Sequence, residues 1–94
     1  VSKAPEYQEW LDVQSATSKA QIENRISLIE CYGHFGDRKK LNSLLWELRW
    51  NNGRRIYFAD LVEQKILLLL GGNKNGQQKD INQAKKILNK HRNA

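Results

Sequence analysis

Residues 44–59 read LLWELRWNNGRRIYFA and give the clearest structural signal in this chain. Two runs rich in large apolar side chains flank the tripeptide at positions 51–53, which ends in Asn-Gly. Asn-Gly between such runs is the strongest short-range signal for a β-hairpin, because both residues of the turn must accept a positive φ. With residues 52–53 as a two-residue loop, Arg49 is predicted to pair with Ile56.

A third strand is predicted from the apolar run Ile66–Leu70. The run shows no alternation of apolar and polar side chains, which is typical of a central strand buried on both faces. The glycine pair at positions 71–72 is expected to end this strand. Residues 1–4 could pair with it, although they are too few to define an element on their own.

Three helical segments surround these strands. Pro5 suits the first turn of a helix, and Ser18 followed by Gln21 reads as a capping box for a second helix that ends at Gly33. A third helix is expected to follow Asp80 and to end near residues 90–92, whose cations complement the helix dipole. The apolar positions with helical spacing are Tyr7, Trp10 and Leu11, then Ile22, Ile26 and Ile29, and finally Ile81, Ala84, Ile87 and Leu88.

The resulting order, α-α-β-β-β-α, predicts a fold of the α+β class. We expect an N-terminal α-hairpin packed on a small antiparallel β-sheet, with a C-terminal helix. A chain of 94 residues buries only about two-thirds of its unfolded surface, which allows one small core. The expected domain organisation is therefore a single domain spanning residues 1–94.

Composition argues against several classes of protein. The longest apolar run, residues 66–70, is far shorter than the roughly 20 residues of a membrane helix. No signal-peptide pattern is visible at the N-terminus. Cys31 is the single cysteine, and His34 and His91 are the two histidines, so neither a disulfide nor a metal centre is expected. We expect a protein of the reducing cytoplasm with no metal, no cofactor and no membrane partner.

Positive charge is concentrated in the second half of the chain. The chain has 16 Lys and Arg against 10 Asp and Glu, a net charge of +6. Residues 1–47 hold six basic and seven acidic side chains, whereas residues 48–94 hold ten basic and three acidic ones, a difference of +7. This asymmetry favours a polyanion or an acidic protein as partner. The alternative is that the charge only keeps the protein soluble.

Four of these cations lie on or beside the predicted strands: Arg49, Arg54, Arg55 and Lys74. Strands are poor places for charge, so such side chains must face solvent, form ion pairs or serve a ligand. The structural alternatives are an ion pair for Arg49 and an exposed position in a solvated loop for Arg54 and Lys74. Tyr57 lies among these cations, and an aromatic ring beside arginines suits single-stranded RNA. The alternative for Tyr57 is a place in the core.

Residues 46–49 (WELR), 55–58 (RIYF) and 66–74 (ILLLLGGNK) together resemble the RelE/ParE toxin superfamily. More narrowly, they are similar to the addiction-module killer proteins of the RelE/HigB type. The resemblance covers nearly the whole chain and is densest over residues 46–84. Two departures stand out: the hairpin is shorter than is usual in the family, and residues 1–4 are all that could remain of its first strand.

This resemblance implies the toxin of a bacterial type II toxin–antitoxin pair, neutralised by a small DNA-binding antitoxin. RelE-like members cleave mRNA on the ribosome without a metal, which makes mRNA and the ribosome the expected partners. ParE-like members instead poison DNA gyrase, and an inactive relative that only binds its antitoxin is a further alternative. Growth arrest by mRNA cleavage is the leading hypothesis.

The resemblance also assigns roles to individual residues. Arg49 and Arg55 are expected to clamp the scissile phosphate, and Lys74 to stabilise the phosphate or the leaving group. Tyr57 is expected to stack on a base or to help move a proton. These four form the predicted catalytic set, and the predicted RNA-binding residues are Arg54, Gln77 and Lys79.

Overall fold

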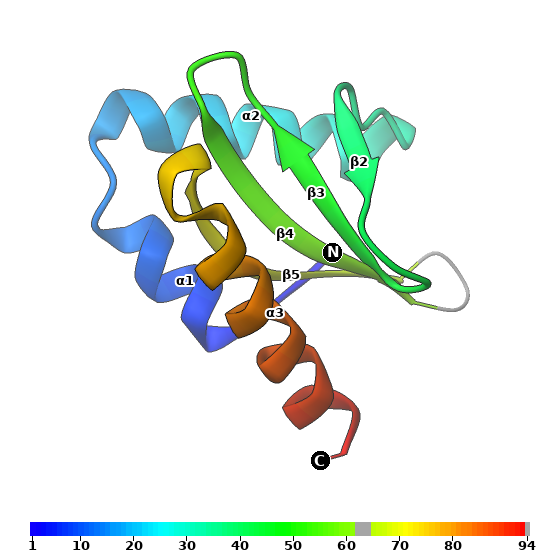
Figure 1. Cartoon of the computed structure of the whole chain (residues 1–94). Helices are drawn as coiled ribbons and strands as arrows, with labels where there is room; N and C mark the ends of the chain where they lie inside the picture. Colours follow the sequence, from blue (N-terminus) through cyan, green and yellow to red (C-terminus); the bar gives the residue numbers. More distant parts are fainter. Residues whose placement is uncertain (62–64, 94) are drawn as a thin grey trace.

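The computed structural model describes residues 1–61 and 65–93 (Figure 1). Its elements in chain order are β1 (Ser2–Lys3), α1 (Pro5–Asp12), α2 (Ala16–Tyr32), β2 (Arg38–Lys40), β3 (Leu45–Arg49), β4 (Arg54–Leu61), β5 (Lys65–Asn73), the 3₁₀ turn η2 (Lys74–Gly76) and α3 (Gln77–Arg92). The strands form one sheet in the order β1-β5-β4-β3-β2. All neighbouring pairs are antiparallel except β1 with β5, which is parallel. Within the described residues, no helix combines the length and the apolar character needed to cross a membrane.

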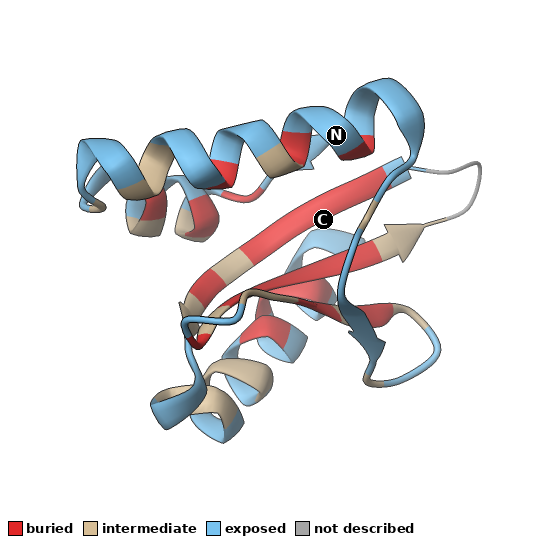
Figure 2. Ribbon diagram, turned by 90° about the horizontal axis from the view of Figure 1, so that it is seen from above, coloured by how far each residue is buried: buried red, intermediate tan, exposed pale blue. Residues whose placement is uncertain are grey.

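The sheet lies between two helical layers, and the mixture of helices with a mainly antiparallel sheet confirms the predicted α+β class. Figure 2 shows α1 and α2 on one face, α3 on the other, and the buried parts of the strands between them. The strand β5 contributes to both cores: Ile66 and Leu68 pack with α1 and α2, and Leu67 and Leu69 pack with α3. The unbroken apolar run of β5 is thus explained by helices on both faces.

The β3–β4 hairpin has a three-residue loop rather than the predicted two-residue loop. Trp50 N donates to Arg54 O at 3.0 Å, and Gly53, with φ of 94°, donates back to Trp50 O at 3.1 Å. A glycine with positive φ at the third loop position is the usual way to close such a loop. The register is therefore shifted by one residue, and Arg49 pairs with Arg55 instead of Ile56.

The glycine pair does not end β5, which continues to Asn73. A Cβ at Gly71 would overlap the indole ring of Trp10, and a Cβ at Gly72 would overlap the carboxylate of Asp80. These glycines therefore permit close packing of α1 and α3 on the two faces of the strand. The helix α3 also starts earlier than predicted, at Gln77, so that Asp80 lies within its first turn.

The start of α2 also differs from the prediction. Its N-cap is Ser15, whose hydroxyl accepts a hydrogen bond from Ser18 N at 3.1 Å, so Ser18 is a helical residue and not the cap. The other two helix signals are confirmed: Pro5 opens α1, and Gly33 ends α2 with φ of 65°.

Two short strands were not assigned as elements from the sequence, although the suggested pairing of residues 1–4 with the apolar run at 66–70 is confirmed. β2 consists of Arg38–Lys40, three exposed cations that show no apolar alternation, and it pairs with β3 at the edge of the sheet. β1 is two residues long and extends the opposite edge through Ser2 and Lys3. Both elements are defined by pairing with a neighbouring strand, and neither carries a pattern of its own.

Replacing Ser15 with alanine should lower the free energy of unfolding by about 1 kcal/mol, because the first turn of α2 loses a side-chain acceptor. Chemical denaturation measures this change. The matched control is Thr17→Ala, an exposed position in the same turn, which should change stability by less than about 0.5 kcal/mol. Equal effects of the two variants would contradict Ser15 as the cap.

Candidate functional site

A polar cluster lies on the α3 face of the sheet, close to the β3–β4 hairpin. Alternate residues of β3 and β4 point to this face. Among these residues, Leu45 and Ala59 belong to the core beneath α3. Nearer to the hairpin, the residues that point to this face are polar. The Glu47 cluster, as we name it, consists of Glu47 and Arg49 from β3, Arg55 and Tyr57 from β4, and Gln77 from α3.

Glu47 is the centre of this cluster, and its side chain is fully buried. Its Oε1 lies 3.5 Å from Arg49 Nε and 3.6 Å from Arg55 Nε. Its Oε2 accepts a hydrogen bond of 2.6 Å from Gln77 Nε2. A buried carboxylate needs such partners, because an unpaired charge in the interior is costly. Two guanidinium groups share one carboxylate, so these three side chains together carry one excess positive charge.

The two arginines differ in what they expose. Arg55 is 10% exposed at its side chain, and its Nη1 donates to Trp50 O at 3.1 Å and to Arg54 O at 3.0 Å. Arg55 thus ties the hairpin loop to Glu47. Arg49 is 37% exposed and turns its buried Nε toward Glu47. The Nη groups of Arg49 therefore lie on the exposed side of its guanidinium, where an anion can reach them.

Tyr57 lies in the core beneath α3 and is fully buried. In the part of the chain that the structure describes, its hydroxyl has no hydrogen-bond partner. Burial raises the pKa of this phenol, and the negative charges of Glu47 and Asp80 raise it further. The hydroxyl therefore stays protonated at neutral pH. The ring is not accessible for stacking on a base in this structure, so the core alternative describes it.

Lys74 lies at the same end of the sheet as the Glu47 cluster. Its backbone N donates to Gly53 O at 2.9 Å, and its Cγ and Cδ would lie 3.4 Å from a Cβ on Gly53. The lysine therefore packs against the hairpin loop, and it is exposed. Arg55 pairs with Arg49 on one side and with Gly72 on the other. The sheet thus brings Arg49, Arg55 and Lys74 to one end of the molecule.

Arg54 points to the opposite face of the sheet. Its Nη1 donates to Gln21 Oε1 at 3.2 Å, its Nη2 donates to Ser18 Oγ at 3.1 Å, and its guanidinium stacks on Trp50 at 5.4 Å. It is therefore bound to α2 and separate from the Glu47 cluster. Of the other predicted RNA-binding residues, Gln77 is bonded into the cluster, and Lys79 is exposed on the first turn of α3.

Two carboxylates of this region were not proposed as site residues from the sequence. Glu47 is one of them, although a carboxylate inside an apolar strand signals a buried polar cluster. Asp80 lies over the backbone of Gly72, and burial raises the pKa of its carboxyl group. Among the described residues, no three His, Cys, Asp or Glu side chains are grouped so that they could hold a metal ion.

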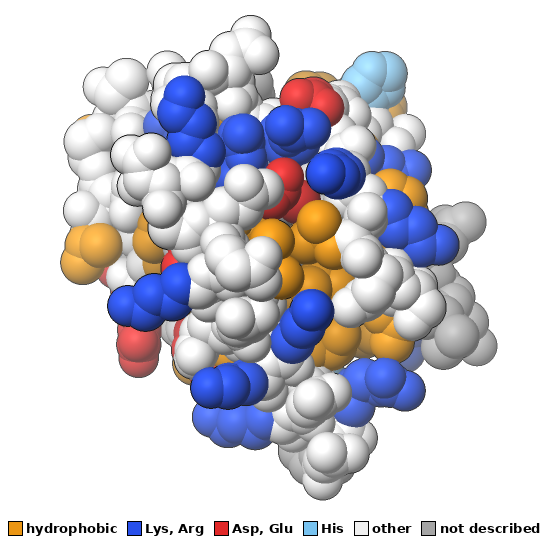
Figure 3. Space-filling view, viewed as in Figure 1, with side chains coloured by type: hydrophobic (Ala, Val, Ile, Leu, Met, Phe, Trp, Pro, Cys, Tyr) orange, Lys and Arg blue, Asp and Glu red, His pale blue; other side chains and the backbone are white. Residues whose placement is uncertain are grey.

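The surface over this cluster is basic. Figure 3 shows Lys and Arg side chains gathered along the upper part of this face, around a small acidic spot and above an apolar area beside α3. The partly buried residues that pack against the core on this side are Leu41, Leu44, Leu61, Leu70 and Ile81. A basic rim next to an apolar surface can bind both a phosphate backbone and a protein partner.

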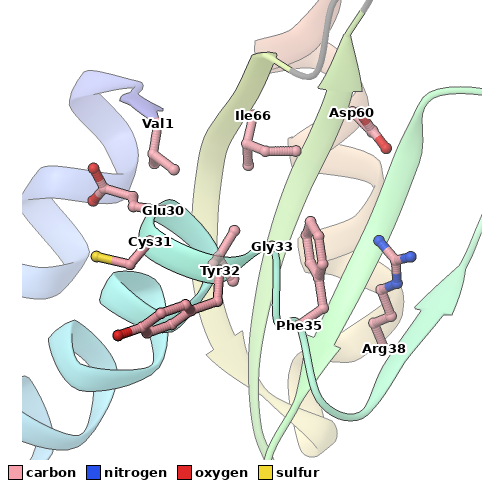
Figure 4. A pocket seen from close by; sticks show the side chains of 10 residues that line it. Val1, Glu30, Cys31, Tyr32, Gly33, Phe35, Arg38, Asp60 and Ile66 are labelled. Carbon is pink, nitrogen blue, oxygen red and sulfur yellow. The ribbon is translucent and has the colours of Figure 1, made fainter.

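A separate hollow of about 620 Å³ lies at the other end of the strands. Figure 4 shows Cys31 and Tyr32 from the end of α2 on one side, and Arg38, Asp60 and Ile66 from three strands on the other. The residues that line this hollow include no member of the Glu47 cluster. It therefore does not belong to the candidate site, which is a surface rather than a pocket.

Comparison with known proteins places the chain in a family. Residues 9–91 match the family described as phage derived protein Gp49-like (DUF891). The chain belongs to this Gp49-like family. A relative from Haemophilus influenzae, described as an uncharacterized protein, is 38% identical over 82 residues, which are 84% of this chain and 82% of the relative.

The fold of this Gp49-like chain is also known from a solved structure. It is similar to a chain in the crystal structure of the RelB–RelE antitoxin–toxin complex from Methanococcus jannaschii, with a TM-score of 0.68 and 14% sequence identity. The match covers 84% of this chain and 96% of that chain. The predicted RelE-like α+β fold is therefore confirmed. At this identity the likeness concerns the fold alone.

Proposed function

We propose that the chain is the toxin of a type II toxin–antitoxin pair and that it cleaves mRNA on the ribosome. The observation that carries the proposal is the meeting of Arg49, Arg55 and Lys74 at one end of a RelE-like sheet. Its partners would be a cognate antitoxin, mRNA and the ribosome, in the cytoplasm. The basic surface around the cluster supports an anionic substrate (Figure 3).

In the proposed chemistry the RNA 2′-oxygen forms a bond to the adjacent phosphorus while the bond from phosphorus to the 5′-oxygen of the next nucleotide breaks, which leaves a 2′,3′-cyclic phosphate and a 5′-hydroxyl. The 2′-hydroxyl gives its proton to water, and the leaving 5′-oxygen takes one from water. Negative charge builds on the phosphate oxygens during this step. The exposed Nη groups of Arg49 would donate two parallel hydrogen bonds to that charge. Lys74 would bind the phosphate or the leaving oxygen as a point charge. A preorganised donor of this kind contributes roughly 3–4 kcal/mol to the transition state where water is excluded.

Arg55 and Tyr57 would contribute in a different way from that expected for exposed residues. Arg55 would act through Glu47, which it holds in place together with the hairpin loop. The Tyr57 hydroxyl would remain buried and protonated within the cluster.

A gyrase-poisoning toxin of the ParE kind is the second candidate. It is favoured by the burial of Arg55 and Tyr57, which leaves two of the four predicted catalytic side chains, Arg49 and Lys74, at the surface. A toxin that acts by binding alone needs no catalytic set.

Induced expression in bacteria should halt growth, and sequencing of mRNA 5′ ends should reveal new cleavage products within minutes. Arg49→Ala should reduce cleavage by about 10²–10³-fold, because a transition-state donor is lost. The matched control is Arg92→Ala, which removes an exposed arginine at the end of α3 and should leave cleavage unchanged. Growth arrest with intact mRNA and a DNA-damage response would indicate the gyrase poison. An absence of any growth defect would indicate an inactive relative.

A further inference from the structure

Arg25 of α2 joins three segments of the chain through backbone carbonyl groups. Its Nε and Nη2 donate to Phe35 O at 3.2 and 3.0 Å, and its Nη2 also donates to Asp37 O at 2.7 Å. Its Nη1 donates to Arg49 O. The guanidinium stacks on the ring of Trp50 at 4.3 Å. A single side chain thus connects α2, the loop before β2 and the end of β3.

These contacts are too specific for an ordinary solvated arginine. Every hydrogen-bond acceptor of Arg25 is a main-chain oxygen, so the contacts depend on the path of the backbone. Gly36 follows that path with φ of 71°, and a Cβ there would lie 3.1 Å from Arg25 Nη2. The loop therefore wraps closely around the guanidinium. Only the planar fork of arginine offers donors in several fixed directions at once.

The contacts converge on the backbone of Arg49. Arg49 N donates to Asp37 O at 3.0 Å, and Arg49 O accepts from Arg25, which also donates to Asp37 O. Both main-chain groups of Arg49 are thus held by this arrangement. Arg49 is the last residue of β3 and lies one residue beyond the pairing of β3 with β2, which ends at Leu48. Without these contacts the backbone of Arg49 would lose its support on the β2 side, and its side chain would lose its fixed direction toward Glu47.

We propose that Arg25 is the positioning residue of the site: it fixes the end of β3 and so directs the guanidinium of Arg49 at the substrate phosphate. This proposal rests on the proposed function for its effect on cleavage. The claim that Arg25 holds the backbone of Arg49 concerns structure alone, and it can be tested without measuring cleavage. Within the described residues, Arg25 bonds to the Glu47 cluster through the backbone of Arg49, so its influence passes through that residue.

The first test measures amide hydrogen exchange in the purified wild-type protein and in Arg25→Lys. Lysine keeps the charge but has its three donors on one nitrogen, so it lacks the planar fork that reaches the carbonyl groups from separate nitrogens. The Arg49 amide should exchange at least about tenfold faster in the variant, because it loses the support of charged hydrogen bonds. Amides of β4 and β5, such as that of Leu68, should stay unchanged. Unchanged exchange at Arg49, or equal acceleration in every strand, would overturn the proposal.

The second test is a double-mutant cycle on single-turnover cleavage of ribosome-bound mRNA. Arg25→Lys should slow cleavage about tenfold in the wild-type background and should have no further effect in Arg49→Ala, because Arg25 acts through Arg49. Arg38→Ala is the control: it removes an exposed arginine side chain that stacks on Phe35 and Trp46. Among the described residues this side chain makes no hydrogen bond to the backbone of Arg49, so cleavage should stay unchanged. Equal slowing in both backgrounds would indicate a general structural role and contradict the proposal. If wild-type protein cleaves no mRNA, the proposed nuclease fails, while the exchange result still decides whether Arg25 holds Arg49.

Discussion

Replacing Glu47 with glutamine should lower the free energy of unfolding by about 3 kcal/mol. The substitution keeps the shape of the side chain and an oxygen that can accept from Gln77. It removes the one carboxylate that lies within 3.6 Å of the buried Arg55 guanidinium among the described residues. Leaving a buried cation without its counter-charge is far more costly than losing a surface ion pair. Equilibrium denaturation in guanidinium chloride measures the loss.

A control and a double variant make this result specific. Glu9→Gln removes an exposed carboxylate of α1 and should change stability by less than about 0.5 kcal/mol. In the double variant Glu47→Leu/Arg55→Met the buried charges disappear together, so most of the lost stability should return. The proposed cluster would be contradicted if Glu47→Gln were as stable as wild type, or if the double variant were less stable than Glu47→Gln.

Replacing Gly71 with alanine should also lower the free energy of unfolding by about 3 kcal/mol, because the added methyl group overpacks the core. A Cβ at this position would overlap the indole of Trp10, a rigid ring packed between α1 and the sheet. The ring also lies against Tyr7, with ring centroids 5.9 Å apart, so it has little freedom to move away. Thermal or chemical denaturation measures the loss.

Gly76→Ala is the matched control for this prediction. Gly76 has a φ of −104°, which any residue can adopt, and a Cβ there would lie 3.4 Å from Asp80 Oδ2 in ordinary contact. Its stability should therefore change by less than about 1 kcal/mol in either direction. The smaller side chain of Trp10→Leu should restore part of the loss caused by Gly71→Ala. Identical stabilities of the two alanine variants would argue against close packing at Gly71.

Most of the fold could be predicted because its signals are local or periodic. The apolar run of β5, the Pro5 helix start and the Gly33 helix end each reflect the chemistry of a few neighbouring residues. Two errors were local, namely the length of the hairpin loop and the N-cap of α2. The others arose where two remote segments meet. Gly71 and Gly72 read as a strand end from sequence, but in the fold they admit Trp10 and Asp80. The edge strand β2 exists only because β3 lies beside it.

Part of the Glu47 cluster is formed by residues that the sequence proposed, but Glu47 at its centre is not one of them. The sequence indicates that Arg49, Arg55 and Lys74 lie near one sheet surface, and the structure brings all three to the hairpin end. A one-residue change in loop length shifts the register of a hairpin by one residue, so different side chains become paired and share a face of the sheet. That shift pairs Arg49 with Arg55 and sends Arg54 to the α2 face. Whether an arginine is exposed depends on its neighbours in space, and a local sequence pattern does not predict these neighbours.

By itself, then, the amino-acid sequence determined the class of fold, the basic character of the second half and the residue types available for binding a phosphate. These properties follow from hydrophobic periodicity and from charge, which are summed along the chain. Tertiary structure alone decided that Glu47 is the buried counter-charge, that Arg49 is the exposed guanidinium and that Arg25 holds its backbone. The physical reason is that burial and hydrogen-bond partners arise between segments far apart in the chain, here between α2, β3, β4 and α3.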